Sequence, residues 1–243
     1  MEIFFQPESW LALLTLTLLE IVLGVDNVIF ISIVTNKLPE EQQEKARVTG
    51  LALAMIFRIA LLFGISFIIH LTAPLFTISD FEFSWRDLIL SIGGLFLIAK
   101  STSEINHKME TEDKSQKTNA AKSFGYAIFQ IIMLDIIFSF DSILTAVGLT
   151  EKVVLMITAV VISMIIMMLF ANKVADVLKK HPSLEVLALS FLILIGFMLM
   201  IDAMHYHVPK GYIYFALFYS LFVQLLNIQV KKRARMKAEA SAS

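Results

Sequence analysis

Seven long apolar runs divide the chain, and each approaches the roughly 20 residues that a membrane-spanning helix needs. The runs show no alternation of polar and apolar positions of the kind that indicates strands. We therefore predict an all-α membrane protein with seven transmembrane helices, over about 10–34, 48–72, 87–99, 124–149, 153–171, 184–201 and 211–230. The third run is short, and we expect it to continue through Lys100 to Glu104, because long side chains near a helix end can reach the interface.

The composition agrees with burial in lipid. Hydrophobic residues make up 58% of the 243 positions and charged residues 17%, with a mean hydropathy of +0.78. A soluble domain is about half apolar and a quarter charged, and a chain of this length cannot hide the excess in one core. The absence of cysteine excludes thiolate metal sites, iron–sulfur clusters and cysteine nucleophiles. The net charge of −1 indicates no nucleic-acid partner.

The basic residues predict the orientation. Sixteen of the 20 lysines and arginines fall in the loops after the odd-numbered spans and in the tail, and three fall on the opposite face. Cytoplasmic loops carry the excess of such residues, so we place the N-terminus outside and the C-terminus in the cytoplasm. The polar segment of about 105–122 is expected to be a mobile cytoplasmic linker. The basic tail, 231–243, is expected to set the topology, with binding to anionic lipid as the alternative.

An acidic motif occurs twice, 115 positions apart. Each copy has an acid, a second acid six residues later and then an amide or hydroxyl residue. The first copy supplies Glu20, Asp26 and Asn27, and the second supplies Asp135, Asp141 and Ser142. With three spans per copy, the second copy enters the membrane from the other side. This predicts two inverted repeats, about 9–104 and 123–203, of the type found in transporters, with the last span as an appendage within a single domain of 1–243.

Carboxylates inside a bilayer are costly, at about 2.5–3.5 kcal/mol or more each. Arg58 is the one base at comparable depth to these four acids. The remaining deficit of positive charge can be met by protons, by a bound cation, or by both in alternation, which is what a cation/proton exchanger needs.

Helix geometry separates the two acids within each motif. Six residues along an α-helix place Glu20 and Asp26 about 120° apart and about 9 Å apart along the axis, so ligands must converge from two spans. We predict a central site from Glu20 and Asp135, flanked by Asp26 and Asp141. Asn27 and Ser142 would add neutral oxygens, and unwinding at Gly24 could merge all of these into one cluster. Such oxygen ligands suit hard divalent cations such as Mg²⁺, Ca²⁺ or Mn²⁺.

Several alternatives compete with this interpretation. Arg58 either pairs structurally with an acid or takes part in gating, and protonated acids could simply join helices by hydrogen bonds. An aspartyl dyad leaves Glu20 and Asp135 without a role, so we expect no enzyme. His205 and His207 are either interfacial or collectors of cations, and Gly93 with Gly94 is expected to allow close helix packing.

The motifs resemble one known family. The stretches LLEIVLGVDNVIFISIVTNKLP (18–39), LDIIFSFDSILTAVGL (134–149) and HVPKGYIYF (207–215) are similar to TerC integral membrane proteins. That family is named for tellurium resistance and is grouped with LysE-like exporters, and several members export manganese. The resemblance implies that both acidic motifs occupy the family's functional positions and that Arg58 and Lys100 with Glu104 fit its pattern. Gln224 departs from it where an acid is usual, which argues against ion binding by the last span.

Together these features predict a bacterial inner-membrane exporter of a hard divalent cation. Mn²⁺ is the favoured cargo and protons are the candidate counter-ion, with no resident cofactor. The alternative is a non-transporting membrane scaffold in the response to metal or tellurite stress, which has little use for acids in the bilayer.

The orientation can be tested with reporters. A green fluorescent protein fused after residue 243 should fluoresce, and alkaline phosphatase at the same point should be inactive, because the tail is cytoplasmic. Phosphatase fused after residue 208 is the matched control and should be active. Active phosphatase at the C-terminus would overturn the orientation.

Overall fold

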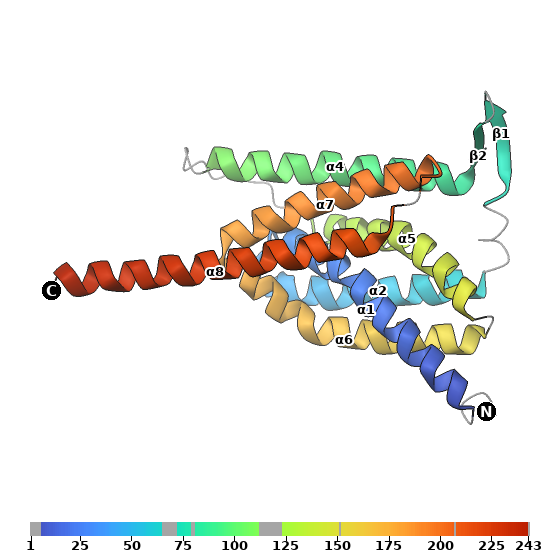
Figure 1. Cartoon of the computed structure of the whole chain (residues 1–243), viewed down its shortest axis with the longest axis horizontal. Helices are drawn as coiled ribbons and strands as arrows, with labels where there is room; N and C mark the ends of the chain where they lie inside the picture. The colour runs from blue at the N-terminus through green and yellow to red at the C-terminus, as the bar shows by residue number, and fades with distance from the viewer. Residues whose placement is uncertain are drawn as a thin grey trace.

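The computed structural model describes residues 6–64, 72–78, 81–111, 123–150, 152–206 and 208–242. Within these ranges, seven helices are long and apolar enough to cross a membrane, as predicted. They run roughly parallel to one another in alternating directions (Figure 1). The helices are α1 (Pro7–Thr35), α2 (Glu40–Phe63), α4 (Trp85–Thr111), α5 (Phe124–Leu149), α6 (Val153–Lys180), α7 (Pro182–Ala203) and α8 (Lys210–Ala242).

A β-hairpin projects from one end of the bundle and was not predicted. Its strands, β1 (Pro74–Ile78) and β2 (Phe81–Ser84), pair antiparallel with Thr77 opposite Glu82. Phe81 and Phe83 alternate with polar positions, but over four residues such a pattern is too short to stand out beside the apolar runs. The helix predicted over 48–72 instead begins at Glu40 and ends at Phe63. The predicted residues 65–71 lie outside the described part of the structure.

Three helices extend well past the C-terminal ends of the apolar runs that predicted them. α4 continues to Thr111, seven residues into the segment expected to be a linker, and α6 continues to Lys180. α8 runs through the basic tail to Ala242. The added segments are rich in lysine, alanine, methionine and glutamate, which favour helix, whereas a hydropathy criterion detects only the part that faces lipid. Residues 112–122 lie outside the described ranges.

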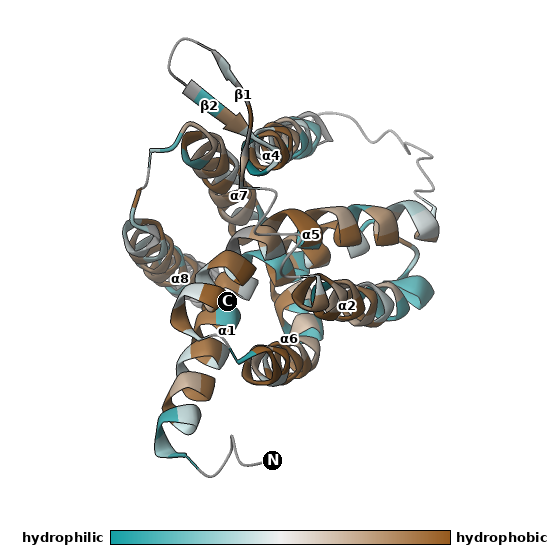
Figure 2. Cartoon of the chain, turned by 90° about the vertical axis from the view of Figure 1, so that its right-hand side faces the viewer, coloured by the Kyte–Doolittle hydropathy of each residue, from teal (hydrophilic) through white to brown (hydrophobic). Residues whose placement is uncertain are grey.

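The most extensive contacts join helices of the two halves of the chain. α4 packs along α7, α1 along α6, and α2 along α5 and α6. The end view shows α1, α2, α5 and α6 grouped together, with α8 at the periphery (Figure 2). In the predicted inverted repeats, α1, α2 and α4 correspond to α5, α6 and α7. The contacts are compatible with that correspondence, and the inverted symmetry stays a prediction.

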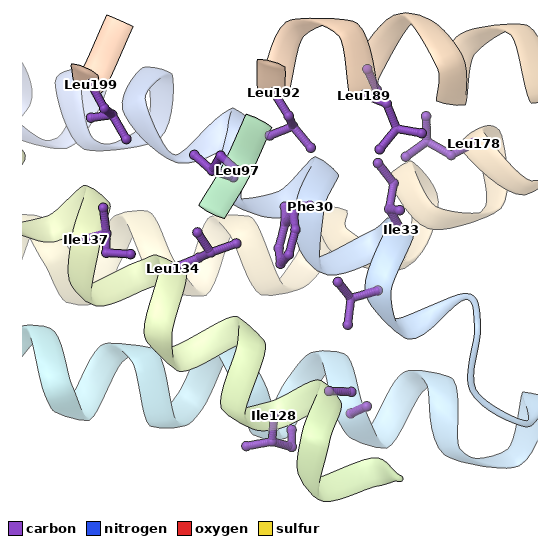
Figure 3. Packing of buried hydrophobic residues seen from close by; sticks show 14 of the residues in the cluster. Phe30, Ile33, Leu97, Ile128, Leu134, Ile137, Leu178, Leu189, Leu192 and Leu199 are labelled. Atoms are coloured by element: carbon purple, nitrogen blue, oxygen red, sulfur yellow. The ribbon is translucent and has the colours of Figure 1, made fainter. Parts of the chain in front are cut away.

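Buried side chains fill the spaces between these pairs. One cluster joins α1, α4, α5 and α7 through residues that include Phe30, Leu97, Leu134, Ile137 and Leu192 (Figure 3). A second cluster lies between α1, α2, α5 and α6. The span of α8 buries none of its apolar window, which agrees with its expected place outside the repeats.

Glycines bring α4 and α7 into direct backbone contact. A Cβ atom built on Gly94 would lie 2.5 Å from the carbonyl oxygen of Gly196, and one on Gly196 would lie 2.7 Å from that of Gly94. Gly93 faces Ile137 of α5 at a similarly short distance. The prediction that Gly93 and Gly94 permit close helix packing is confirmed.

We expect Gly94→Ala to lower the thermal stability of the purified protein. The new methyl group would push the backbones of α4 and α7 apart, and overpacking of this kind costs about 1–3 kcal/mol. Gly148→Ala is the matched control, because a Cβ there meets nothing within 4 Å. Unfolding temperatures in detergent check this, and equal temperatures for the two variants would contradict it.

Candidate functional site

Arg58 lies between two acids of the repeated motifs. Its Nη1 donates to Oε2 of Glu20 at 2.5 Å, and its Nη2 donates to Oδ1 of Asp135 at 2.8 Å. The three side chains come from α2, α1 and α5, and each is at most 4% exposed. The guanidinium therefore joins the central acids of both motifs, as one cation shared by two carboxylates.

Polar side chains complete the surroundings of these acids. The hydroxyl of Ser139 donates to Oδ2 of Asp135 at 3.1 Å, and the amide of Asn27 donates to Oδ1 at 3.4 Å. The hydroxyl of Ser142 lies near Glu20 and donates to the backbone oxygen of Ser139 at 3.3 Å. Asn27 was expected to offer an oxygen, but its amide nitrogen faces Asp135, because the carboxylate needs donors. Ser139 was not predicted as a site residue, although its position one helical turn after Asp135 identifies it as a possible partner of that carboxylate.

Asp26 belongs to a different part of the site. It is 6% exposed, and it lines a cavity of about 620 Å³ with Ser142, while Glu20 faces Arg58. This separation follows from the six-residue spacing on one helix. α1 is continuous from Pro7 to Thr35, so the alternative of unwinding at Gly24 is not observed. Gly24 instead packs against Met167, where a Cβ atom would collide with the sulfur.

Asp141, the corresponding acid of the second motif, lies on α5, but its side chain is outside the described part of the structure. Its place in the candidate site therefore stays a prediction.

Lys100 and Glu104 lie apart from the central acids. Nζ of Lys100 is 2.9 Å from Oε1 of Glu104, and Lys37, which follows α1, also pairs with Glu104. This contact joins the end of α1 to α4, toward the end of the bundle where basic residues concentrate. Lys100 and Glu104 therefore help to join two helices at that end of the bundle, and neither residue contacts Arg58.

His205 ends α7 in a left-handed conformation, with φ of 63°. Its Nε2 lies 3.1 Å from Oδ2 of Asp87, and the neighbouring Asp202 accepts from Nη2 of Arg86 at 3.0 Å. Asp87 also accepts from the backbone and hydroxyl of Ser84, so it caps the first turn of α4. His205 therefore ties α7 to α4, and His207 lies outside the described residues.

No group of three or more histidine, aspartate or glutamate side chains is gathered closely enough to hold a metal ion in the described part of the chain. Glu20 and Asp135 have suitable oxygens, and the cation between them is Arg58. In this conformation the guanidinium occupies the position between Glu20 and Asp135, and a metal site at these acids stays a prediction.

The sequence also matches a known protein family. The model of the family described as "Integral membrane protein TerC family" matches residues 5–239. The chain belongs to the TerC family. No solved structure matches it.

Relatives of this TerC protein come from several bacteria. It is 53% identical to the UPF0053 inner membrane protein YgdQ of Escherichia coli K12, over 94% of this chain and 96% of the relative. It is 47% identical to a UPF0053 protein of Haemophilus influenzae, over 93% and 96%. The UPF0053 inner membrane protein YoaE of E. coli K12 is 44% identical over 96% of this chain but only 45% of its own length. These names give a location and no reaction or cargo. With seven spans, the chain is a multi-pass protein of the bacterial inner membrane.

Substitutions in the Arg58 cluster should be strongly non-additive. Arg58→Met leaves Glu20 and Asp135 buried without a counter-charge, and breaking a buried pair in this way costs about 3–5 kcal/mol. The triple variant Arg58→Met, Glu20→Gln, Asp135→Asn carries no buried charge here and should regain most of the lost stability.

Unfolding temperatures of these two variants and the wild type in detergent measure the effect. Lys45→Met, at an exposed position on the same helix, controls for loss of a positive charge. A triple variant as unstable as Arg58→Met would show that the charges are not what couples these residues.

Proposed function

We propose that this TerC protein exports a hard divalent cation across the inner membrane, with Mn²⁺ as the cargo and protons as the counter-ion. The observation that carries the proposal is the sharing of one guanidinium by Glu20 and Asp135. Both carboxylates are buried at the middle of spans from opposite halves of the chain, and nothing in a purely structural role requires a second acid.

Charge balance supports exchange at this position. Two carboxylates and Arg58 leave one negative charge if both acids are ionised, and burial makes such a charge costly. A divalent cation would match the two carboxylates if Arg58 moved aside. When the cation leaves, one or two protons could bind to the carboxylates in its place. Glu20, Asp135 and Arg58 would thus alternate between an internal ion pair and a cation complex.

Arg58 has the properties that this exchange needs. Its Nε has no hydrogen-bond partner among the described residues, although the side chain is 2% exposed. It is held by two carboxylates and no other described group, so displacing it breaks only the contacts that the cargo would replace. We assign Arg58 a gating role on this basis.

The neighbouring donors bear on the choice of cation. Carboxylates with hydroxyl and amide neighbours favour Mg²⁺, Ca²⁺ and Mn²⁺ over soft metals, and the chain has no thiolate. Among these cations, Mn²⁺ is favoured by the family resemblance alone.

Cellular metal content tests the proposal. Cells challenged with Mn²⁺ should contain less manganese when the wild-type protein is expressed than when it is absent. Glu20→Gln and Asp135→Asn should abolish the difference because they remove ligands, and Asp26→Asn and Asp141→Asn should reduce it. Glu41→Gln, exposed at the start of α2, is the control and should export normally.

Inductively coupled plasma mass spectrometry would measure manganese, magnesium and calcium together, at matched membrane levels of each variant. Equal manganese with and without the wild-type protein would refute Mn²⁺ export. Export by all four acid variants at the wild-type rate would refute the site while leaving transport intact.

A further inference from the structure

A cavity of about 620 Å³ lies between α1, α5, α7 and α8. Most of its wall is apolar, with side chains such as Leu18, Val22 and Met198. Its polar lining consists chiefly of Asp26, Ser142 and Thr145, followed by Arg86, Asp202 and Tyr214. The cavity thus joins residues of the acidic motifs to residues near the helix ends.

The inner end of the cavity reaches the candidate site. Asp26 and Ser142 line it, and the hydroxyl of Ser142, which lies near Glu20, donates to the backbone oxygen of Ser139 at 3.3 Å. One side chain therefore separates the cavity from the cluster of Glu20, Arg58 and Asp135.

Arg86 at the start of α4 and Asp202 at the end of α7 line the other end of the cavity, and these helix ends lie at the end of the bundle that carries the N-terminus and the β-hairpin (Figure 1). Arg86 pairs with Asp202 there, and Val208 of the connection to α8 and Gly211 in the first turn of α8 also line the cavity. The loop charges predict that this face is outside. Beyond the central acids toward the opposite face, Phe30, Leu97 and Leu134 belong to one buried cluster of closely packed side chains (Figure 3).

We propose that this cavity is a water-filled route that connects the central acids with the outer face, and that it is the exit path of a hydrated cation. The second part rests on the proposed function. A cation that keeps six waters needs about 180 Å³ at roughly 30 Å³ per water, which the cavity exceeds. Asp26, Ser142 and Thr145 offer oxygens along it, whereas a lipid chain would leave the carboxylate of Asp26 facing hydrocarbon at a high cost.

Such a route makes the molecule asymmetric across the membrane. The central acids communicate with the outer face and are closed from the cytoplasmic face, and Arg58 takes the position between them after the cargo has gone. This is the state expected of an exporter after release.

The absence of native cysteine permits a direct test by single-cysteine labelling. Thr145→Cys and Leu23→Cys place thiols in the cavity. Thr158→Cys and Val25→Cys are their matched controls, at similar depths on α6 and α1 but outside the cavity lining. A membrane-impermeant cationic methanethiosulfonate is added to spheroplasts and, separately, to inverted membrane vesicles.

In spheroplasts, each cavity cysteine should react about tenfold or more faster than its control, because the reactive thiolate forms in water and not in lipid. The same cysteines should react slowly in inverted vesicles. Equal rates within both pairs would overturn the route and favour a lipid-filled cavity. Faster reaction from the cytoplasmic face would also overturn it.

Millimolar Mn²⁺ separates this inference from the proposed function. Slower labelling of Leu23→Cys in its presence supports both the route and the cargo. Fast labelling that Mn²⁺ leaves unchanged supports the water-filled route and counts against Mn²⁺ as its cargo. Elution of each variant as a single folded species in detergent is required before its rate is compared.

Discussion

The structure depends on the ion pairs that Arg58 makes with Glu20 and Asp135. The two carboxylates and the guanidinium are buried in a bundle surrounded by lipid. Their burial is tolerated only because the opposite charges are paired. These ion pairs fix α1, α2 and α5 relative to one another at the middle of the membrane. Because Arg58 supplies two donors, it pairs with Glu20 of its own half of the chain and also with Asp135 of the other half, which therefore depends on the first half for its counter-charge. The same requirement makes the cluster a natural place for exchange, since any cation that binds there must replace the arginine.

Close packing around the cluster is achieved by small residues. Gly94 and Gly196 allow α4 and α7 to approach at backbone distance, and Gly24 allows Met167 of α6 to approach α1. Helices in lipid gain little from hydrophobic association, so van der Waals contact of this kind is their main attraction. α8 has no comparable contact, and it instead forms part of the wall of the cavity that contains Asp26. The bundle therefore combines a closely packed interior with a peripheral helix, α8, that packs chiefly against α7.

Predictions from local sequence succeeded where one physical property dominates. The number of spans followed from hydropathy, and the separation of Glu20 from Asp26 followed from helix geometry. The hairpin was missed because its strands are only four and five residues long. The extension of α4 to Thr111 was missed because a hydropathy pattern stops at the membrane surface, while helix propensity does not. The pairing of Lys37 with Glu104 and of His205 with Asp87 depends on which helix ends lie together, which spacing along the chain does not encode.

The sequence by itself determined the membrane class, the spans and the presence of acids at repeated depths, because apolar length and the cost of buried charge are properties of short segments. Only the tertiary structure decided that Arg58 serves Glu20 and Asp135 together, that Ser139 and Asn27 donate to Asp135, and that Asp26 faces a separate cavity. These facts depend on the rotation of each helix about its axis and on its neighbour. Packing of side chains from distant segments sets that rotation, and the free energy of a buried charge depends on partners that lie as many as 108 residues away along the chain.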